Sequence, residues 1–246
     1  MAEVEENLRE GVQLQNGDIV PTMTTAIVGI IIIVILFFLQ RRRSGRRDLL
    51  LMGLCESGKT AIFMQIVFKR LPGTFASFQE NVGHFVSGRW VGRLVDIPGQ
   101  YRVHNKYFDT YKKSAKGIIF VVDSETVEAD IRDVAEAFYN IVSDSATKSC
   151  SILVLCNKQD LDTSESAEVV RSILEKEINS VRDTRSRKLR SSTDDDAMRK
   201  SVYVGKEGID FEFSHLKQKV QFCEGSAMEN QLQELWQWIY NLQSTI

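Results

Sequence analysis

The stretch Asp48-Leu-Leu-Leu-Met-Gly-Leu-Cys-Glu-Ser-Gly-Lys-Thr60 decides the fold of this chain. Its first five residues are too few for a helix and, being mostly apolar, predict a buried parallel strand. The next eight match G-x-x-x-x-G-K-[ST], a loop whose backbone N–H groups surround a phosphate. Gly53 and Gly58 allow the tight curl, and a helix beginning near Lys59 points its positive end at the anion. The order strand, loop, helix disfavours the alternative of a chance glycine-rich turn.

This phosphate loop, residues 53–60, predicts contacts to a nucleotide and a metal. Lys59 is placed to reach the terminal phosphates, and Thr60 can offer its hydroxyl to Mg²⁺. Glu56 either adds a carboxylate near the phosphates or points to solvent. The expected cofactor-binding residues here are Gly53, Leu54, Cys55, Glu56, Ser57, Gly58, Lys59, Thr60 and Ala61.

A second motif, downstream of the phosphate loop, extends the site. Asp96-Ile-Pro-Gly99 follows a strand-like run and lies 43 residues after Gly53. At that distance a P-loop GTPase has an aspartate that holds Mg²⁺ through water, so we expect Asp96 to be a metal residue. The N–H of Gly99 would sense the terminal phosphate, and Gln100, the expected catalytic residue, would orient the attacking water. By itself this motif is weak and is more often a simple turn.

The motif Asn157-Lys-Gln-Asp160 predicts guanine as the base. It ends the apolar run 151–156, and a similar run covers 117–123. Asp160 can accept two hydrogen bonds from guanine, whereas adenine would leave its carboxylate unpaired. Asn157 is expected to brace the loops and the stem of Lys158 to lie along the base. A last strand, 220–223, leads to Ser226 and Ala227, which are expected to complete the base site.

Together these residues resemble the small GTPase superfamily, nearest its Arf/Sar branch. GLCESGKT, DIPGQ, FVVDS, NKQD and the late KVQF and SA stretches, with an N-terminal apolar segment, resemble more closely the family of signal recognition particle receptor beta subunits. The resemblance implies GTP and Mg²⁺ as ligands, with a switch I segment that includes Thr74, Phe75, Ala76 and Ser77. Gln79 occupies what looks like the position of the metal-binding switch I threonine, which would weaken that contact.

The resemblance also implies partners and a location. Family members anchor a peripheral alpha subunit at the endoplasmic reticulum membrane, binding it in the GTP state, and so act indirectly with the ribosome and the signal recognition particle. Two other functions stay open. One is a membrane-anchored Arf-like trafficking GTPase, and the other is a GTP-binding scaffold without useful hydrolysis. Any GTPase activity is expected to be weak or controlled by the partner.

The residues before the domain predict a membrane anchor. No charged residue occurs between Asp18 and Arg41, and an apolar helix over 19–40 would be roughly 31–33 Å long, enough to cross a bilayer. The segment before it, 1–18, is acidic and the segment after it, 41–47, is basic. This order is the reverse of a signal peptide and places the N-terminus in the lumen and the domain in the cytosol.

The remaining features set the expected architecture. An α/β domain over 48–246 should hold a doubly wound, mostly parallel six-stranded sheet. Residues 181–208, rich in charge and poor in large apolar side chains, predict a flexible insertion, and 209–213 alternate like an added edge strand. A net charge of −2 argues against direct DNA binding, and four scattered cysteines argue against disulfides or zinc.

Overall fold

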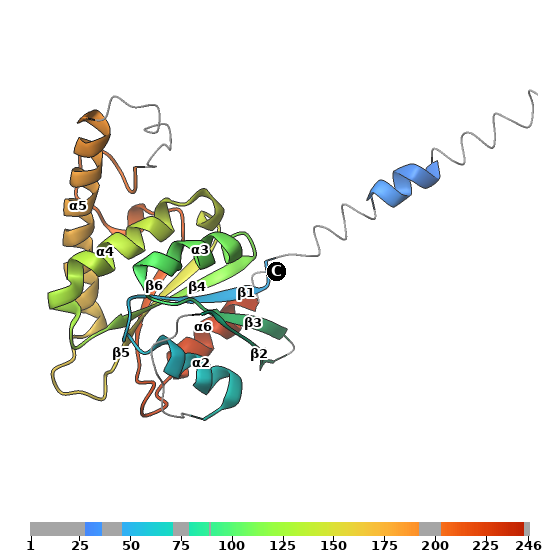
Figure 1. The fold of residues 1–246 in the computed structure, drawn as a ribbon, viewed down its shortest axis with the longest axis horizontal. Helices are drawn as coiled ribbons and strands as arrows, with labels where there is room; N and C mark the ends of the chain where they lie inside the picture. Colours follow the sequence, from blue (N-terminus) through green and yellow to red (C-terminus); the bar gives the residue numbers. More distant parts are fainter. Residues whose placement is uncertain (1–27, 36–45, 71–78, 89, 192–202, 244–246) are drawn as a thin grey trace, which may run out of the picture. The chain divides into compact units, whose positions relative to one another are not determined.

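A computed structural model describes residues 28–35, 46–70, 79–88, 90–191 and 203–243 (Figure 1). The chain divides into two compact units, 1–45 and 46–246. In the first, residues 28–35 are helical. Within the described ranges, no helix has both the length and the apolar character that a membrane span requires. Most of the predicted anchor, 19–40, lies outside those ranges.

The second unit contains one mixed sheet in the order β2-β3-β1-β4-β5-β6. Only the pair β2–β3 is antiparallel, and all other neighbours are parallel. This confirms the predicted six-stranded, mostly parallel α/β architecture. The strands are β1 (Asp48–Met52), β2 (Asn81–Ser87), β3 (Trp90–Asp96), β4 (Ala115–Asp123), β5 (Ser151–Asn157) and β6 (Val220–Glu224).

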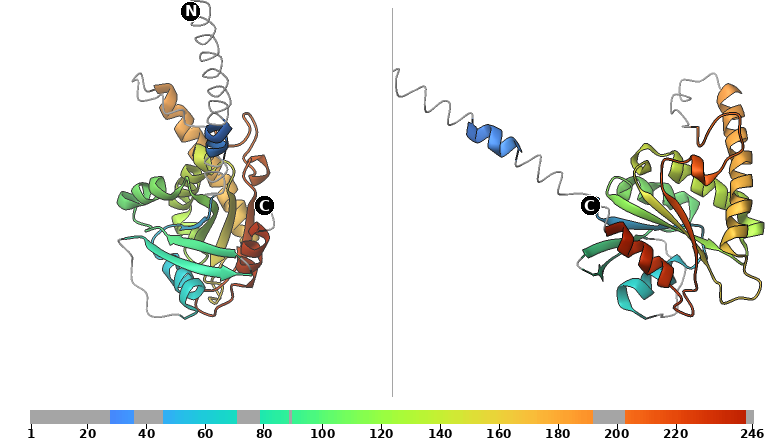
Figure 2. Two further views of the ribbon diagram at one scale, coloured as in Figure 1. Left: turned by 90° about the vertical axis from the view of Figure 1, so that its right-hand side faces the viewer. Right: turned by 180° about the vertical axis from the view of Figure 1, so that it is seen from behind.

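Helices cover both faces of this sheet (Figures 1 and 2). Side chains alternate along a strand, so β1 sends Leu49 and Leu51 into one core and Leu50 and Met52 into the other. The first core includes residues of α2 (Lys59–Phe68) and α6 (Gln233–Gln243), and the second includes residues of α3 (Tyr101–Tyr111), α4 (Val127–Ser143) and α5 (Ala167–Ser191). Burial on both faces explains why these strands read as continuous apolar runs.

The carboxyl ends of the parallel strands meet at one edge of the sheet, as the doubly wound topology requires. The phosphate loop leaves β1 at this edge, Asp96 ends β3, Asp123 ends β4 and Asn157 ends β5. Among the described residues, the order of the strands therefore gathers the predicted polar motifs at a single edge of the sheet.

The prediction that 181–208 forms a flexible insertion is wrong for 181–191, which continue α5 as a helix. Val181 is buried, and the Arg185 guanidinium lies 4.4 Å from the ring centroid of Tyr139 while donating to Asn140. Buried Arg182 donates to the carbonyl oxygens of residues 206 and 209. Arg182 and Arg185 thus stabilise this region through their aliphatic stems and guanidinium groups. A count of charged residues does not predict such contacts. Residues 192–202 lie outside the described part.

The predicted edge strand over 209–213 is also wrong. Phe211 and Phe213 are buried, but the segment forms no strand and ends in a 3₁₀ turn, η3 (Phe213–His215). The ring of Phe213 packs edge-on against Phe138, Phe211 and Phe222, at centroid distances of 4.9–5.5 Å. The alternation therefore reflects aromatic packing over the α4–α5 side of the sheet and does not indicate strand pairing.

Candidate nucleotide-binding site

The phosphate loop has a backbone that only glycine permits at two positions. Gly53 and Gly58 have φ values of 140° and 92°. A Cβ atom at Gly53 would lie 2.2 Å from the carbonyl oxygen of Val121, and one at Gly58 would lie 2.2 Å from Nδ2 of Asn157. The loop is therefore pressed against both β4 and β5. Glu56 also has a left-handed φ, 63°, although it is not glycine.

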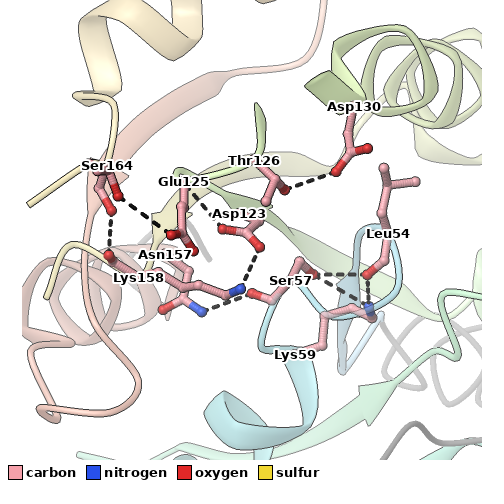
Figure 3. Close-up of polar contacts among 11 residues, drawn as sticks. Leu54, Ser57, Lys59, Asp123, Glu125, Thr126, Asp130, Asn157, Lys158 and Ser164 are labelled. Carbon is pink, nitrogen blue, oxygen red and sulfur yellow. Dashed lines mark hydrogen bonds and ion pairs between the residues drawn. The ribbon is translucent and has the colours of Figure 1, made fainter. Parts of the chain in front are cut away.

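Lys59 lies inside the curl of this loop. Its side chain is buried, and Nζ donates to the carbonyl oxygen of Leu54 and lies 3.5 Å from Oγ of Ser57 (Figure 3). Burial lowers the pKa of the Lys59 ammonium, although the nearby Asp96 acts in the opposite direction. The loop thus holds a buried positive charge with few counter-charges, which an incoming phosphate would provide.

Thr60 and Asp96, the two predicted metal residues, are in contact. Oγ1 of Thr60 donates to Oδ2 of Asp96 over 2.9 Å, and Asp96 is almost completely buried. Burial raises the pKa of the Asp96 carboxyl, whereas hydrogen bonds and Lys59 lower it. A hydroxyl and a carboxylate are hard oxygen donors, so this pair fits Mg²⁺, which takes few protein ligands alongside phosphate oxygens.

A residue that the sequence analysis did not select completes this pair. Asn81 opens β2 and pairs with Asp96 in the antiparallel register. Its Nδ2 donates to Oδ2 of Asp96 over 3.0 Å, so the same carboxylate oxygen accepts from Thr60 and from Asn81. The sequence indicated Asn81 only indirectly, because its pairing with Asp96 becomes apparent once β2 is recognised as a strand.

The segment after β3 crosses the phosphate loop. A Cβ atom at Gly99 would lie 2.5 Å from the backbone nitrogen of Cys55, so this crossing requires glycine. Gln100 is the N-cap of α3, and its carbonyl oxygen accepts from the N–H groups of Val103 and His104. Nδ1 of His104 lies 3.2 Å from the carbonyl oxygen of Pro98, and burial lowers the pKa of this imidazole. Gly99 and Gln100 are thus held at the start of a helix beside the loop.

The predicted switch I residues cannot be placed in the site, because they lie outside the described part of the chain. Thr74, Phe75, Ala76 and Ser77 lie within 71–78, outside the described residues. Gln79 is described and its side chain is exposed.

Asn157 joins the two halves of the site. Its Nδ2 donates to the carbonyl oxygen of Ser57 over 2.8 Å (Figure 3), and its Oδ1 accepts from the backbone N–H of Ala227 over 3.0 Å. The side chain is only 2% exposed. A single amide therefore fixes the phosphate loop, 100 residues before Asn157, relative to the Ser226–Ala227 loop, 70 residues after it.

The residues around Asn157 are also paired. Lys158 has a left-handed φ of 69°, and its Nζ lies 2.5 Å from Oδ2 of Asp123, a partner the sequence analysis had not chosen (Figure 3). Oδ1 of Asp160 accepts from Oγ of Ser226 over 2.5 Å, and that hydroxyl in turn accepts from the N–H of Glu229. The carboxylate of Asp160 keeps its second oxygen for other donors.

Comparisons with known proteins agree with this geometry. The family model described as the signal recognition particle receptor beta subunit matches residues 44–220. The rat signal recognition particle receptor subunit beta is 33% identical over 246 residues, covering 95% of this chain and 91% of the rat protein.

Solved structures show the same likeness. The mammalian signal recognition particle receptor structure superposes with a TM-score of 0.71 at 34% identity, covering 80% of this chain and all of that chain. The complex of SRb-GTP with SRX from Chaetomium thermophilum, at 20% identity, superposes with a TM-score of 0.62 over 79% of this chain and 97% of that one, and supports the fold alone. The chain belongs to the family of signal recognition particle receptor beta subunits.

Proposed function

We propose that this chain binds GTP and Mg²⁺ at the carboxyl edge of its sheet and uses the bound nucleotide to control a protein partner. The observation that carries this is the bridge made by Asn157 between the phosphate loop and the Ser226–Ala227 loop. It joins a phosphate-binding motif to a guanine-type motif at a fixed spacing. The mammalian structure to which this chain is similar is that of the signal recognition particle receptor.

Each side chain has a separate part in this proposal. Lys59 binds the terminal phosphates with its buried ammonium, Thr60 and Asp96 hold Mg²⁺, and Asp160 accepts from guanine. Mg²⁺, when bound, neutralises charge on the phosphate oxygens. Gln100 orients the attacking water, and Gly99 carries the N–H that detects the last phosphate. With Gln79 at the switch I threonine position, we expect slow intrinsic hydrolysis, so that GTP mainly regulates docking.

The partner and the location complete the proposal. We propose that residues 19–40 anchor the chain in the endoplasmic reticulum membrane with 1–18 in the lumen. The domain then holds the alpha subunit of the signal recognition particle receptor in the cytosol and acts on ribosomes only through that partner. Support comes from the apolar run with its basic flank and from the names of the relatives.

The test is nucleotide-dependent docking of a purified alpha subunit. The full chain, in detergent, is loaded either with a non-hydrolysable GTP analogue or with GDP, and the affinity for the alpha subunit is measured by titration. We expect the GTP form to bind at least about tenfold more tightly, a coupling of typical size for a nucleotide switch. Equal affinity for both forms would contradict the proposal, as would binding of Arf-type coat or tether proteins instead.

A further inference from the structure

The loops at the two edges of the sheet carry opposite charge. Four loops lead into β1, β4, β5 and β6 at the amino edge, namely residues 46–47, 112–114, 144–150 and 216–219. They contain seven basic residues and one acidic residue: Arg46, Arg47, Lys112, Lys113, Lys148, Lys217 and Lys219, against Asp144. These four loops are called the amino-edge surface.

The carboxyl edge is acidic. The loops that leave the same four strands are residues 53–58, 124–126, 158–166 and 225–232. They contain six acidic residues and one basic residue: Glu56, Glu125, Asp160, Asp162, Glu165 and Glu229, against Lys158. This edge binds the nucleotide in the proposed function, which gives the amino-edge surface no role. A domain with one basic end and one acidic end turns its basic end toward a negatively charged surface.

The loops of the amino-edge surface adjoin one another. The Arg46 guanidinium donates to the carbonyl oxygen of Ala146 over 2.9 Å, and the N–H of Arg47 donates to the carbonyl oxygen of Ser114 over 3.0 Å. β6 pairs with β5, which brings the fourth loop beside the third. Neighbouring strands lie 4.7–4.9 Å apart, so the loops of these four adjacent strands form one surface about 15 Å wide.

The positive charge of this surface is accessible to a partner. Five of its basic side chains are exposed: Arg47, Lys113, Lys148, Lys217 and Lys219. Within the described residues, the four lysines of this set form no ion pair, and the single acid pairs with Lys112 over 2.7 Å.

Helix dipoles explain only part of this charge. Cations are favoured at the carboxyl end of a helix, and this accounts for Lys112 and Lys113, which directly follow α3. It does not account for Lys148, Lys217 and Lys219, because none of them lies in or next to the last turn of an α-helix. The fold itself therefore does not require these three lysines.

Arg46 shortens the connection between this surface and the proposed anchor. That anchor ends at residue 40, and the hydrogen bonds of Arg46 to the third loop hold the chain to the domain from residue 46 onward. Only residues 41–45 remain as a link, and a stretch of that length spans at most roughly 20 Å. An anchored chain therefore keeps its amino-edge surface close to the bilayer.

We propose that the amino-edge surface binds anionic phospholipid headgroups of the bilayer in which the chain is anchored. An anionic leaflet attracts each nearby lysine over about one Debye length. The contact orients the domain so that the nucleotide site, at the other edge of the sheet, is turned to the cytosol and open to a partner. This inference rests on the anchor of the proposed function and goes beyond it, because an anchor alone leaves the domain free to turn.

The test measures how accessible Lys148 is to a water-soluble reagent. The full chain is inserted into phosphatidylcholine vesicles, with or without phosphatidylserine, and treated with a membrane-impermeant acetylating reagent. Mass spectrometry gives the acetylation rate of Lys148 relative to that of Lys176, an exposed lysine on α5. We expect phosphatidylserine to lower this ratio about fivefold at about 0.1 M salt, the factor that one lysine near an anionic leaflet typically gives. The effect should vanish at about 1 M salt, where the Debye length is about 3 Å.

Two variants with the same change in charge make the test specific. The first replaces three lysines of the amino-edge surface, Lys113→Gln, Lys217→Gln and Lys219→Gln, and keeps Lys148 as the reporter. In this variant phosphatidylserine should lower the ratio by less than about twofold. The matched control replaces three exposed basic residues inside α3, α4 and α5, Lys106→Gln, Arg132→Gln and Arg171→Gln, and should keep the full effect.

The outcomes separate this inference from the proposed function. If alkaline carbonate extracted the chain from the vesicles, the proposed anchor would be wrong and this inference would fail with it. With the chain retained, a Lys148 ratio that phosphatidylserine left unchanged would overturn this inference alone. Equal loss of the effect in the matched control would overturn it as well. Protection of Lys148 by added transfer RNA, with none by phosphatidylserine, would assign the surface to RNA instead of lipid.

Discussion

The phosphate side and the base side of the site are built on opposite principles. On the phosphate side, Lys59 and Asp96 are buried ionisable groups. Burial lowers the pKa of Lys59 and raises that of Asp96, so it favours the neutral form of both. On the base side, Asn157 makes two hydrogen bonds, Lys158 pairs with Asp123, and Asp160 accepts from Ser226. The phosphate side therefore holds buried charges that a ligand can compensate. The side chains of the base side already pair with other groups of the protein.

This difference indicates what each side contributes to binding. Buried charges gain most when a ligand of opposite charge arrives, so the phosphate side should set affinity for any nucleotide. The hydrogen bonds that hold the base-side loops in position cost little free energy. The base side should therefore determine which base is accepted. Substitutions on the two sides should therefore have separable effects.

The largest effect is expected at Asp160. Asp160→Asn should shift the preference from guanine towards xanthine nucleotides by about 10²–10⁴-fold, because two charge-assisted hydrogen bonds are lost and xanthine carries an oxygen where guanine carries an amine. The asparagine oxygen can still accept from Ser226. Competition between GDP and XDP measures the change. Asp162→Asn, an exposed acid two residues on, is the control. An unchanged preference for GDP would remove Asp160 from the base site.

A smaller effect, of a different kind, is expected at Lys59. Lys59→Ala should weaken the binding of GDP and of XDP by the same factor, about 100-fold, because a charge-assisted contact to phosphate is lost. The melting temperature without nucleotide should not fall, since the buried ammonium is unfavourable for folding. Lys176→Ala, an exposed lysine on α5, is the control. Affinity within threefold of the wild type would show that the ammonium does not face the phosphates.

The smallest effect concerns stability at Asp96. Asp96→Asn should stabilise the chain without nucleotide by about 1–3 kcal/mol at neutral pH, because an amide replaces a buried carboxylate while still accepting from Thr60 and Asn81. The folded-state pKa of Asp96 is raised, so its favourable contribution exists below the unfolded pKa and is lost as pH rises through the folded value.

The difference between Asp96→Asn and the wild type should therefore shrink as the pH is lowered, because the wild-type carboxyl then becomes neutral too. Thermal unfolding at several pH values measures this. The variant should also lose the stabilisation that Mg²⁺ adds in the presence of GDP. A variant less stable than the wild type at every pH would mean that Asp96 is favourably ionised in the fold.

The sequence predicted the parts of the fold that repeat a simple pattern. Strands β1, β4 and β5 are runs of mainly apolar residues, and each was predicted as a buried strand. Strand β2 and helix α3 were missed. In β2, Gly83 lies against the side chains of Phe63 and Val67, which leave little room for a Cβ atom. The glycine interrupts the alternation of apolar and polar residues that would predict a strand. α3 is amphipathic, with Phe108 buried and Tyr107 and Tyr111 half-buried, but most of its residues are polar and no run of apolar residues marks it.

The candidate site divides in the same way. Its motifs were visible because phosphate and guanine contacts require particular residue types at fixed spacing. Asn81 and Asp123 were missed because each acts on a residue that another strand or loop brings beside it. Such supporting residues depend on strand register and helix orientation, which single-sequence patterns do not encode.

The burial of the cysteines has a practical consequence for thiol chemistry. Burial raises the pKa of Cys223 to about 12 and also raises those of Cys150 and Cys156, so these thiols carry almost no thiolate at neutral pH. Cys55, in the phosphate loop, is exposed. A maleimide dye should therefore attach at this one position in the native protein. The unmodified sequence thus provides a site for a fluorescent reporter in the phosphate loop, with no engineered cysteine and none removed.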